Sequence, residues 1–409
     1  MNSCPYPTHQ GSSDPPPSSS LITYCSDGCG RTFFFCGHCG QANRPAARFC
    51  RQCGEPILFE ENQAELDLVR PQQEGRTESY RLSEYGVTEA QALIAYKGFL
   101  IVVADQSVLI YDVYKIYEPL YQFRPADRRV IRGVTIVGSD SDEQLLITTS
   151  RSVYRLSLLN MQPEIASVYE AAGDKYITQP AVSCDNQIYV LELDQRQQSS
   201  RLVRLPGEEV FSFAGRGRSL VSLTENRFFF CTQDQVFLYD GGKVLQKQFP
   251  EPLMEADAAY NPESDLIYLV GENGLWRVVV SNEELAIVSL PTRNLGAPLL
   301  AAGTDNLFVA HTQGFLALDP FGGLRWDSVS QHIRAESDGH RPQVTANYVL
   351  FTALGLTGGS KLRIHALNDL NDFRTFDYDQ RLVCPPLLTL GRILSVTGGA
   401  GQTTLNCVV

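Results

Sequence analysis

Short apolar runs separated by turns recur over residues 81–409. Each unit contains two runs of β-branched and aromatic residues around a turn with Gly, Asp or Asn, and the second run often ends at Asp. The segments 96–112, 184–194, 225–240 and 304–319 show this pattern most clearly. Because such runs bounded by turn residues are typical of strands, we expect an all-β domain here.

The units repeat with a nearly constant spacing. One residue from the middle of a strand-like run marks each unit: Leu100, Leu146, Tyr189, Phe229, Tyr268, Phe308, Leu350 and Leu394. Successive markers are 46, 43, 40, 39, 40, 42 and 44 residues apart. A period of about 40–45 residues with several short strands per unit is typical of a β-propeller, in which neighbouring blades cover each other's apolar faces.

The number of units predicts the number of blades. Eight units predict eight blades, and seven blades are the alternative if one unit is a linker. The last unit offers three strands, at PLLTL, RILSVTG and TLNCVV. Because a propeller avoids open edges by closing its ring, we expect the outer strand of this blade to come from the segment near Tyr80 to Tyr85.

The unit at 303–326 resembles the repeats of quinoprotein-type propellers. It contains a strand, then a Gly-x-Leu-Ala-Leu-Asp segment, then a Gly-x-x-x-Trp segment, in the order of those repeats. Trp276 and Trp326 are the only tryptophans, so the regular aromatic docking set of the quinoprotein enzymes is absent from the sequence. The Trp-Asp dipeptide of WD-repeats also occurs once, at Trp326-Asp327. The resemblance therefore implies the architecture and not the quinone chemistry.

The first 80 residues differ in composition from the repeats. Residues 1–22 are rich in Pro, Ser and Gly, which predicts a disordered tail. Residues 59–80 are polar and charged and predict a linker. Residues 23–58 lie between them and carry a compact set of cysteines, so we expect a small separate domain there.

Four of these cysteines have the spacing of a zinc site. They form two Cys-x-x-Cys-Gly turns with ten residues between the turns: Cys36, Cys39, Cys50 and Cys53. Zn²⁺ prefers four soft ligands in a tetrahedron, and each turn presents two thiolates. The segment resembles the zinc-ribbon family, with Phe33, Phe34 and Phe35 forming one ribbon strand. Because all four ligand positions are cysteine, we expect a structural Zn²⁺ that supplies most of the folding free energy of so small a unit.

A second group of metal-ligand side chains lies upstream. Cys25 and Cys29 form a Cys-x3-Cys pair, and Cys4 and His9 precede them. A second zinc site from these four residues is one interpretation. The alternative is a set of exposed side chains that bind nothing, because Cys-x3-Cys is a poorer turn for zinc and the intervening tail is predicted to be disordered.

The charge is unevenly distributed along the chain. The net charge is −12, but residues 1–59 carry +1 and the remainder carries −13. An acidic domain does not favour general nucleic-acid binding. Three arginines lie in or beside the loop between the cysteine pairs: Arg44, Arg48 and Arg51. They are the candidate contacts for nucleic acid or an acidic protein surface, and solvated surface charge is the alternative.

Cysteine usage and hydropathy indicate the compartment. The four cysteines of the repeat domain are scattered through apolar segments: Cys184, Cys231, Cys384 and Cys407. Metal thiolates together with buried free thiols suit a reducing compartment. The first residues lack the basic and apolar regions of a signal peptide, and no apolar run approaches the roughly 18 residues that span a bilayer. We expect a soluble cytoplasmic protein, and the sequence leaves its oligomeric state open.

The sequence shows no standard catalytic motif. His311, His332, His340 and His365 share no short spacing, so we expect them in strands or at the surface. Thr-Gly-Gly-Ser-Lys at 357–361 lacks the spacing of a phosphate-binding loop and predicts a hairpin turn.

These features predict a non-enzymatic protein–protein interaction scaffold, in which a tethered structural zinc ribbon adds a second contact to an acidic propeller. Propeller faces suit this role because variable loops converge there on a rigid frame. Two alternatives stay open. One is a nucleic-acid-associated accessory factor that binds through the ribbon arginines, and the other is a ligand-binding or enzymatic propeller with its site in the central channel.

Overall fold

The computed structural model describes the N-terminal part in pieces and the repeat domain almost throughout. The described residues are 22–24, 32–35, 42–43, 52 and 77–408, the last with gaps at 97, 114, 127, 139–142, 159–166, 185, 225–226, 254–257, 282–283, 293–294, 296–297, 332–335, 356–357, 390–391 and 400–401.

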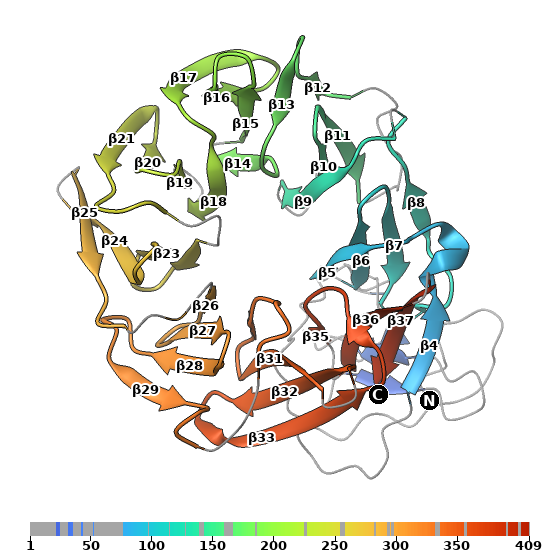
Figure 1. Ribbon diagram of the computed structural model, residues 1–409. Coiled ribbons are helices and arrows are strands. Elements are labelled where there is room, and N and C mark those ends of the chain that lie inside the picture. Colours follow the sequence, from blue (N-terminus) through green and yellow to red (C-terminus); the bar gives the residue numbers. More distant parts are fainter. Residues whose placement is uncertain are drawn as a thin grey trace.

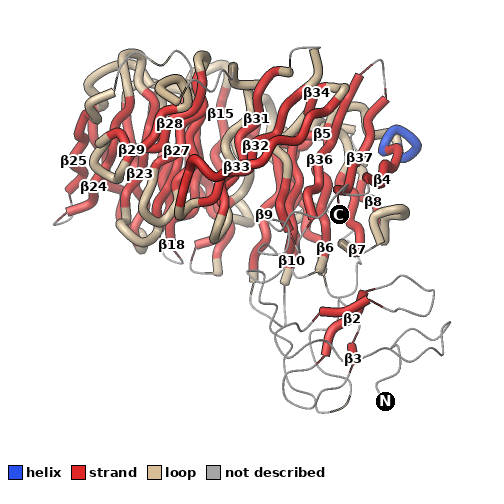
Figure 2. Tube along the Cα trace, turned by 90° about the horizontal axis from the view of Figure 1, so that it is seen from below, coloured by secondary structure: helices blue, strands red, loops and turns tan. Residues whose placement is uncertain are grey.

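Eight antiparallel sheets stand around a central axis (Figure 1). In Figure 1 the chain passes round the ring once, from the blue strand β4 to the red strand β37, which lie side by side. Seen from the side in Figure 2, the strands run through the thickness of a disc. The prediction of an all-β, eight-bladed propeller is therefore confirmed, and the seven-bladed alternative is wrong.

We number the blades 1 to 8 from β5 onward. Blade 1 contains β5 (Ala90–Tyr96), β6 (Phe99–Ala104), β7 (Val108–Asp112) and β8 (Tyr121–Phe123). Blade 2 contains β9 (Ile131–Val137), β10 (Gln144–Thr149), β11 (Ser152–Ser157) and β12 (Tyr169–Glu170). Blade 3 contains β13 (Lys175–Ile177) and β14 (Val182–Cys184), which both pair with β15 (Gln187–Asp194), then β16 (Ser199–Arg204) and β17 (Glu208–Ala214). Blade 4 contains β18 (Arg218–Thr224), β19 (Arg227–Cys231), β20 (Gln235–Asp240) and β21 (Lys243–Gln248).

The second half of the ring repeats this arrangement. Blade 5 contains β22 (Ala259–Asn261), β23 (Leu266–Val270), β24 (Leu275–Ser281) and β25 (Glu284–Ser289). Blade 6 contains β26 (Leu299–Ala302), β27 (Leu307–His311), β28 (Gly314–Leu318) and β29 (Leu324–Asp327). Blade 7 contains β30 (Gln343–Val344), β31 (Tyr348–Leu354), β32 (Ser360–Ala366) and β33 (Asp369–Tyr378). Blade 8 contains β34 (Arg381–Leu382) and β35 (Leu387–Thr389), which both pair with β36 (Arg392–Gly399), then β37 (Gln402–Val408) and β4 (Thr77–Arg81).

A separate three-stranded sheet lies in the N-terminal part. It contains β1 (Ile22–Tyr24), β2 (Thr32–Phe35) and β3 (Ala42–Asn43) in that order. The predicted strand of three phenylalanines is confirmed, because all three lie in β2. The 3₁₀-helix η1 (Leu82–Tyr85) follows β4. Among the described residues, no helix is long and apolar enough to cross a membrane.

The apolar side chains of each strand alternate between two neighbouring blades. Phe228 and Phe230 of β19 pack toward blade 3, whereas Phe229 between them packs toward blade 5. The described buried residues form eight such clusters, one at each contact between adjacent blades. The eight markers of the repeat all lie in the second strand of a blade and are at most 2% exposed. Burial on both faces explains why these strands are almost continuously apolar in the sequence.

The recurring Asp at the ends of strands has a local cause. The Asp319 carboxylate accepts hydrogen bonds from the N–H groups of Gly323 at 2.9 Å and Phe321 at 2.8 Å, and these bonds lower the pKa of Asp319. Asp194 accepts in the same way from the N–H of Arg196 at 3.0 Å. An Asp at this position therefore stabilises the turn to the next strand rather than marking a catalytic site.

The ring closes between β37 and β4. Leu405 of β37 lies opposite Tyr80 of β4, and the Ser79 hydroxyl donates to Asn406 Oδ1 at 2.8 Å. The outer strand of blade 8 was expected near Tyr80 to Tyr85 and begins slightly earlier, at Thr77. Residues 77–80 of the predicted linker 59–80 lie in β4, which pairs with β37 of the propeller.

We expect removal of β4 to destabilise the whole ring, because it exposes the edge of β37 and part of the cluster between blades 8 and 1. A chain without residues 1–81 should unfold at least about 5 °C below a matched chain that lacks only residues 1–76 and keeps β4. Thermal unfolding followed by circular dichroism measures the difference. Equal melting temperatures for the two truncations would show that β4 does not hold the ring closed.

His365 introduces a pH-dependent group into the core of blades 6 and 7. Its side chain is fully buried beside Trp326, Phe351 and Phe373, with ring centroids 5.0, 5.5 and 4.8 Å away. Nδ1 donates to the carbonyl of Leu370 at 2.7 Å, and Nε2 has no hydrogen-bond partner among the described residues. Burial lowers the pKa of His365 to about 4.

The propeller should lose stability as the pH falls from about 6.5 to 4. In that range the unfolded state binds a proton at His365 and the folded state does not, which amounts to about 3 kcal/mol by pH 4. Urea unfolding of the wild type and His365→Gln at pH 7, 5.5 and 4 measures this effect. The stability difference between the two proteins should shrink as the pH falls, and a constant difference would contradict the assignment.

Candidate functional site

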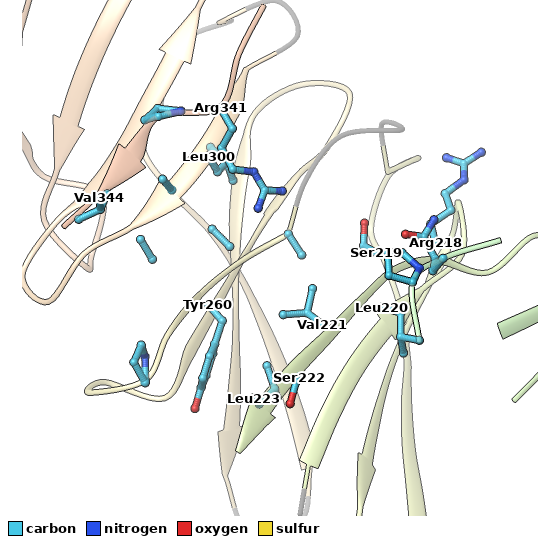
Figure 3. Close-up of a pocket in the computed structure, with 18 of the residues that line it drawn as sticks. Arg218, Ser219, Leu220, Val221, Ser222, Leu223, Tyr260, Leu300, Arg341 and Val344 are labelled. Atoms are coloured by element: carbon cyan, nitrogen blue, oxygen red, sulfur yellow. The ribbon is translucent and has the colours of Figure 1, made fainter. Parts of the chain in front are cut away.

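A cavity of about 900 Å³ opens in the central channel. The first strands of blades 4 to 7, namely β18, β22, β26 and β30, form its walls (Figure 3). These strands line the channel because each is the innermost strand of its sheet (Figure 1). Concave sites at the centre of a rigid frame are the usual location of ligand contacts.

Arginines gather at one end of this channel. Arg218 is the first residue of β18, and Arg216 and Arg341 lie two residues before β18 and β30. Arg132 is the second residue of β9. All inner strands start at the same face of the ring, so these four arginines surround one mouth of the channel. We call these four residues the arginine collar. Among the described residues close to the start of an innermost strand, one acid also occurs: Glu89, just before β5.

Irregular backbone occurs at two positions in or beside the collar. In β9, Thr148 pairs with Gly133 and Thr149 pairs with Ile131, so Arg132 is the extra residue of a β-bulge. In β18 the register also shifts between Arg218 and Val221, and Ser219 has a positive φ of 51°. Bulges and positive φ values at non-glycine residues are costly and concentrate beside functional sites, where they redirect side chains.

A buried hydroxyl positions Arg216. Ser200 is 2% exposed and donates to the carbonyl of Gly215 at 2.7 Å, while it accepts from the N–H of Gly217 at 2.9 Å. These two bonds hold the backbone on both sides of Arg216, whose side chain is exposed. Arg216 is therefore presented to solvent from a fixed turn.

A second buried network precedes Arg341. The Asp338 carboxylate accepts from the hydroxyl of Ser360 and from Arg381 Nε at 3.2 Å. His340 Nε2 hydrogen-bonds the carbonyl of Leu382 at 2.9 Å, so the loop before β30 is tied to blade 8. In Figure 3 the side chain of Arg341 points toward the centre of the cavity, and Arg218 lies on the opposite wall.

The channel wall becomes apolar further from the mouth. Leu223 lies five residues beyond Arg218 along β18, roughly 16 Å from it along the strand. Val221, Ala302 and Val344 line this part and are partly exposed. The cavity therefore combines a charged entrance with an apolar interior.

Tyr260 is the aromatic residue of the described cavity wall. Its hydroxyl donates to Asp265 Oδ1 at 2.9 Å, and Asp265 in turn accepts two hydrogen bonds of 3.0 Å from Arg227. Burial and the neighbouring Asp265 raise the pKa of Tyr260 to about 12. Tyr260 therefore stays neutral at physiological pH, with its hydroxyl held away from the cavity.

The groups that face the cavity are suited to binding an anion. The described lining residues supply guanidinium, hydroxyl and amide donors, and no carboxylate, imidazole or thiol is among them. Arg132 and Arg216 form no ion pair with any described residue, and both are exposed. Guanidinium groups of this kind bind carboxylates or phosphates through charge-assisted hydrogen bonds.

The metal and arginine sites predicted from the sequence lie outside the described residues. This holds for the four-cysteine zinc site, for the second candidate site and for the ribbon arginines: Cys36, Cys39, Cys50, Cys53, Cys4, His9, Cys25, Cys29, Arg44, Arg48 and Arg51. Elsewhere, the described residues contain no group of three or more His, Cys, Asp or Glu side chains placed to hold a metal.

The histidine and cysteine predictions for the propeller are confirmed where they are described. His311 lies in β27 and His365 in β32, on different blades, whereas His332 falls outside the described residues. The four cysteines of the propeller are buried free thiols: Cys184, Cys231, Cys384 and Cys407. Gly358 and Gly359 lie in the connection between the antiparallel strands β31 and β32, and Ser360 and Lys361 begin β32, so the predicted hairpin is confirmed in its described part.

The arginine collar is the feature that sequence reasoning missed. Net charge alone favours the ribbon as the anion contact, because the propeller carries a large negative net charge. The sequence does contain a signal for the collar, because Arg132, Arg218 and Arg341 each lie close to the start of the first strand of a repeat. Aligning the eight units on their first strands would have placed these three arginines within four alignment positions of one another.

A comparison with protein families decides the nature of the N-terminal domain. The zinc-ribbon domain matches residues 35–57, a segment that contains both Cys-x-x-Cys turns. The chain carries an N-terminal zinc ribbon. The ribbon is followed by the eight-bladed propeller, so the resemblance to these two classes is confirmed.

Solved structures resemble the propeller in fold alone. A dihydro-heme d1 dehydrogenase, NirN, in complex with DHE is 13% identical, with a TM-score of 0.53, and the alignment covers 73% of this chain and 68% of that chain. The β-propeller domain of Cps50 (Swd1) from Myceliophteria thermophila is 10% identical, with a TM-score of 0.41, covering 54% of this chain and 80% of that chain. A search of curated proteins finds no significant match.

The ribbon's donor set fits zinc. Four thiolates from the two Cys-x-x-Cys turns would complete a tetrahedral shell around Zn²⁺ and would leave no position for a substrate. A glycine follows each second cysteine, at Gly40 and Gly54, and would allow backbone N–H groups to turn toward the sulfurs. The metal supplied here would hold the small domain together rather than take part in a reaction.

We expect about one tightly bound zinc per chain, lost on replacing Cys50 and Cys53 by Ser. Zinc analysis of the purified protein by mass spectrometry measures this. The propeller should unfold at the same temperature in both proteins, because the described members of its eight clusters all lie between Tyr80 and Val408. Two zinc ions in the wild type would instead support a second site at Cys4, His9, Cys25 and Cys29.

Proposed function

We propose that this protein is a non-enzymatic interaction scaffold that binds a protein partner at the mouth of its central channel. The observation that carries the proposal is the arginine collar around the cavity of about 900 Å³. The zinc ribbon adds a second, tethered contact to the same assembly. The zinc thiolates and the buried free thiols of the propeller also support a cytoplasmic location.

The rigidity of the ring supports this function. Each blade is packed between two neighbours, and the collar residues stand on innermost strands or on turns held by buried hydrogen bonds. The backbone of such a frame loses little conformational freedom when a partner binds. A preorganised concave surface of this kind binds more tightly than a flexible one of the same size.

The distribution of charge supports an acidic partner. The chain beyond residue 59 carries a net charge of −13, yet four arginines surround one opening. Low-dielectric walls around a charged opening focus its field, so an acidic group is drawn to the mouth while the rest of the surface repels it. This arrangement gives one preferred docking position.

Charge reversal at the mouth should abolish capture of the partner. We expect the wild type to retain one stoichiometric protein from a native extract after nuclease treatment, and Arg216→Glu/Arg341→Glu to retain little of it. Quantitative mass spectrometry of the captured proteins measures the ratio. Cys50→Ser/Cys53→Ser should lose only the part of the affinity that the ribbon contributes.

The matched control reverses two charges on the outside of the ring. Lys247 lies in the outermost strand of blade 4 and Arg325 in that of blade 6, and both are exposed. Lys247→Glu/Arg325→Glu has the same net charge as the mouth variant and should capture the partner as the wild type does. Equal capture by the mouth variant, or recovery of nucleic acid alone, would remove the basis of the proposal.

A further inference from the structure

We propose that the arginine collar and the cavity behind it recognise an acidic peptide segment of the partner, with glutamate or aspartate side chains at the mouth and an apolar side chain in the channel. This inference rests on the proposed function and names the chemistry of the group that the scaffold binds. Three features of the channel favour a peptide segment over other anions.

The first feature is the spacing of the collar around the ring. Arg132 belongs to blade 2, Arg216 and Arg218 to blade 4 or the connection before it, and Arg341 to the connection before blade 7. Neighbouring blades of an eight-bladed ring differ by about 45°, so blades 4 and 7 differ by about 135° around the axis. One small anion does not contact arginines on such separate walls. A chain with several carboxylates spans them.

The second feature is the change from charge to apolar surface along the channel. Arg341 and Arg218 stand at the entrance, and Val221, Ala302 and Val344 lie further inside. A free phosphate or a polyanion without apolar groups leaves this inner wall in contact with water. A peptide with an apolar residue between acidic ones buries it, which adds favourable free energy.

The third feature concerns aromatic side chains. Single-stranded nucleic acid binds by stacking its bases on exposed aromatic rings. The described cavity wall contains one aromatic residue, Tyr260, whose hydroxyl is tied to Asp265 at 2.9 Å. The channel therefore lacks, in its described part, the series of rings along which successive bases stack. Carboxylates of a peptide match the guanidinium groups without any stacking.

The fixed backbone around the collar suits recognition of an extended segment. Ser200 holds both neighbours of Arg216, and the bulge in β9 presents Arg132 out of register with its partner strand. Since these positions are set by the fold, the carboxylates of a bound peptide must follow their spacing. We therefore expect the order of acidic and apolar residues in the peptide to affect its affinity.

Fluorescence anisotropy with a labelled octapeptide tests the inference on the full-length protein. In the probe, pairs of glutamates flank single leucines, and in two matched peptides every glutamate becomes glutamine or every leucine becomes serine. The glutamate probe should bind the wild type, and binding should weaken as salt screens the charges. The glutamine peptide should not bind measurably, and the serine peptide should bind about tenfold more weakly.

Protein variants locate the binding site. Arg216→Glu/Arg341→Glu should weaken binding of the glutamate probe at least about tenfold, and Arg216→Ala/Arg341→Ala should have an intermediate effect. Lys247→Glu/Arg325→Glu is the matched charge control and should bind as the wild type does. Arg44→Ala/Arg48→Ala/Arg51→Ala tests the ribbon and should also bind normally. Thermal unfolding of each variant confirms that the propeller is intact.

Several results would overturn the inference. Undiminished binding by the mouth variants, or loss of binding only in the ribbon variant, would place the contact elsewhere. Full competition by inorganic phosphate would indicate a small-anion site, and tighter binding of an oligonucleotide of equal charge would indicate nucleic acid. If the peptide fails to bind but the mouth variants still lose the protein partner, the scaffold function stands and the acidic segment is wrong.

Discussion

The packing of each blade against its two neighbours is the constraint on which this structure depends. A four-stranded sheet with two apolar faces is not stable alone in water, and the ring solves this by covering every face with another blade. The alternation of Phe228, Phe229 and Phe230 between two clusters shows the solution in one strand. Because every face must be covered, no blade can be lost without exposing two clusters, and the ring must close on itself.

This constraint also shapes the candidate site. The apolar side chains of the second and third strands are committed to contacts between blades. The charged groups of the site therefore collect where the chain enters the innermost strands. The bulge at Arg132 and the positive φ of Ser219 occur where the strands leave regular pairing. Stable packing outside the channel thus leaves the channel mouth free to vary, and function concentrates there.

The fold was more predictable than the site, for a physical reason. Each repeat must place a large apolar residue in its second strand, so Leu100, Phe229 and Leu394 mark their blades along the chain. The zinc ligands are also local, because two short turns supply all four. The collar is different, because Arg132 and Arg341 are more than 200 residues apart in sequence and come to the same mouth of the channel only when the ring closes. Net charge also points away from the collar, because it averages over all the charged residues of the domain.

The closing pair of strands also imposes an order on biosynthesis. Ser79 of β4 and its partner Asn406 of β37 are separated by 327 residues, so β4 cannot pair with β37 until almost the whole propeller has been synthesised. At a synthesis rate of roughly 5–20 residues per second, the wait lasts about 15 to 65 seconds. The zinc ribbon needs only its own thiolates and the metal, so it can fold during this interval. On the ribosome, the ribbon can therefore be folded while the propeller still lacks the strand that closes its ring.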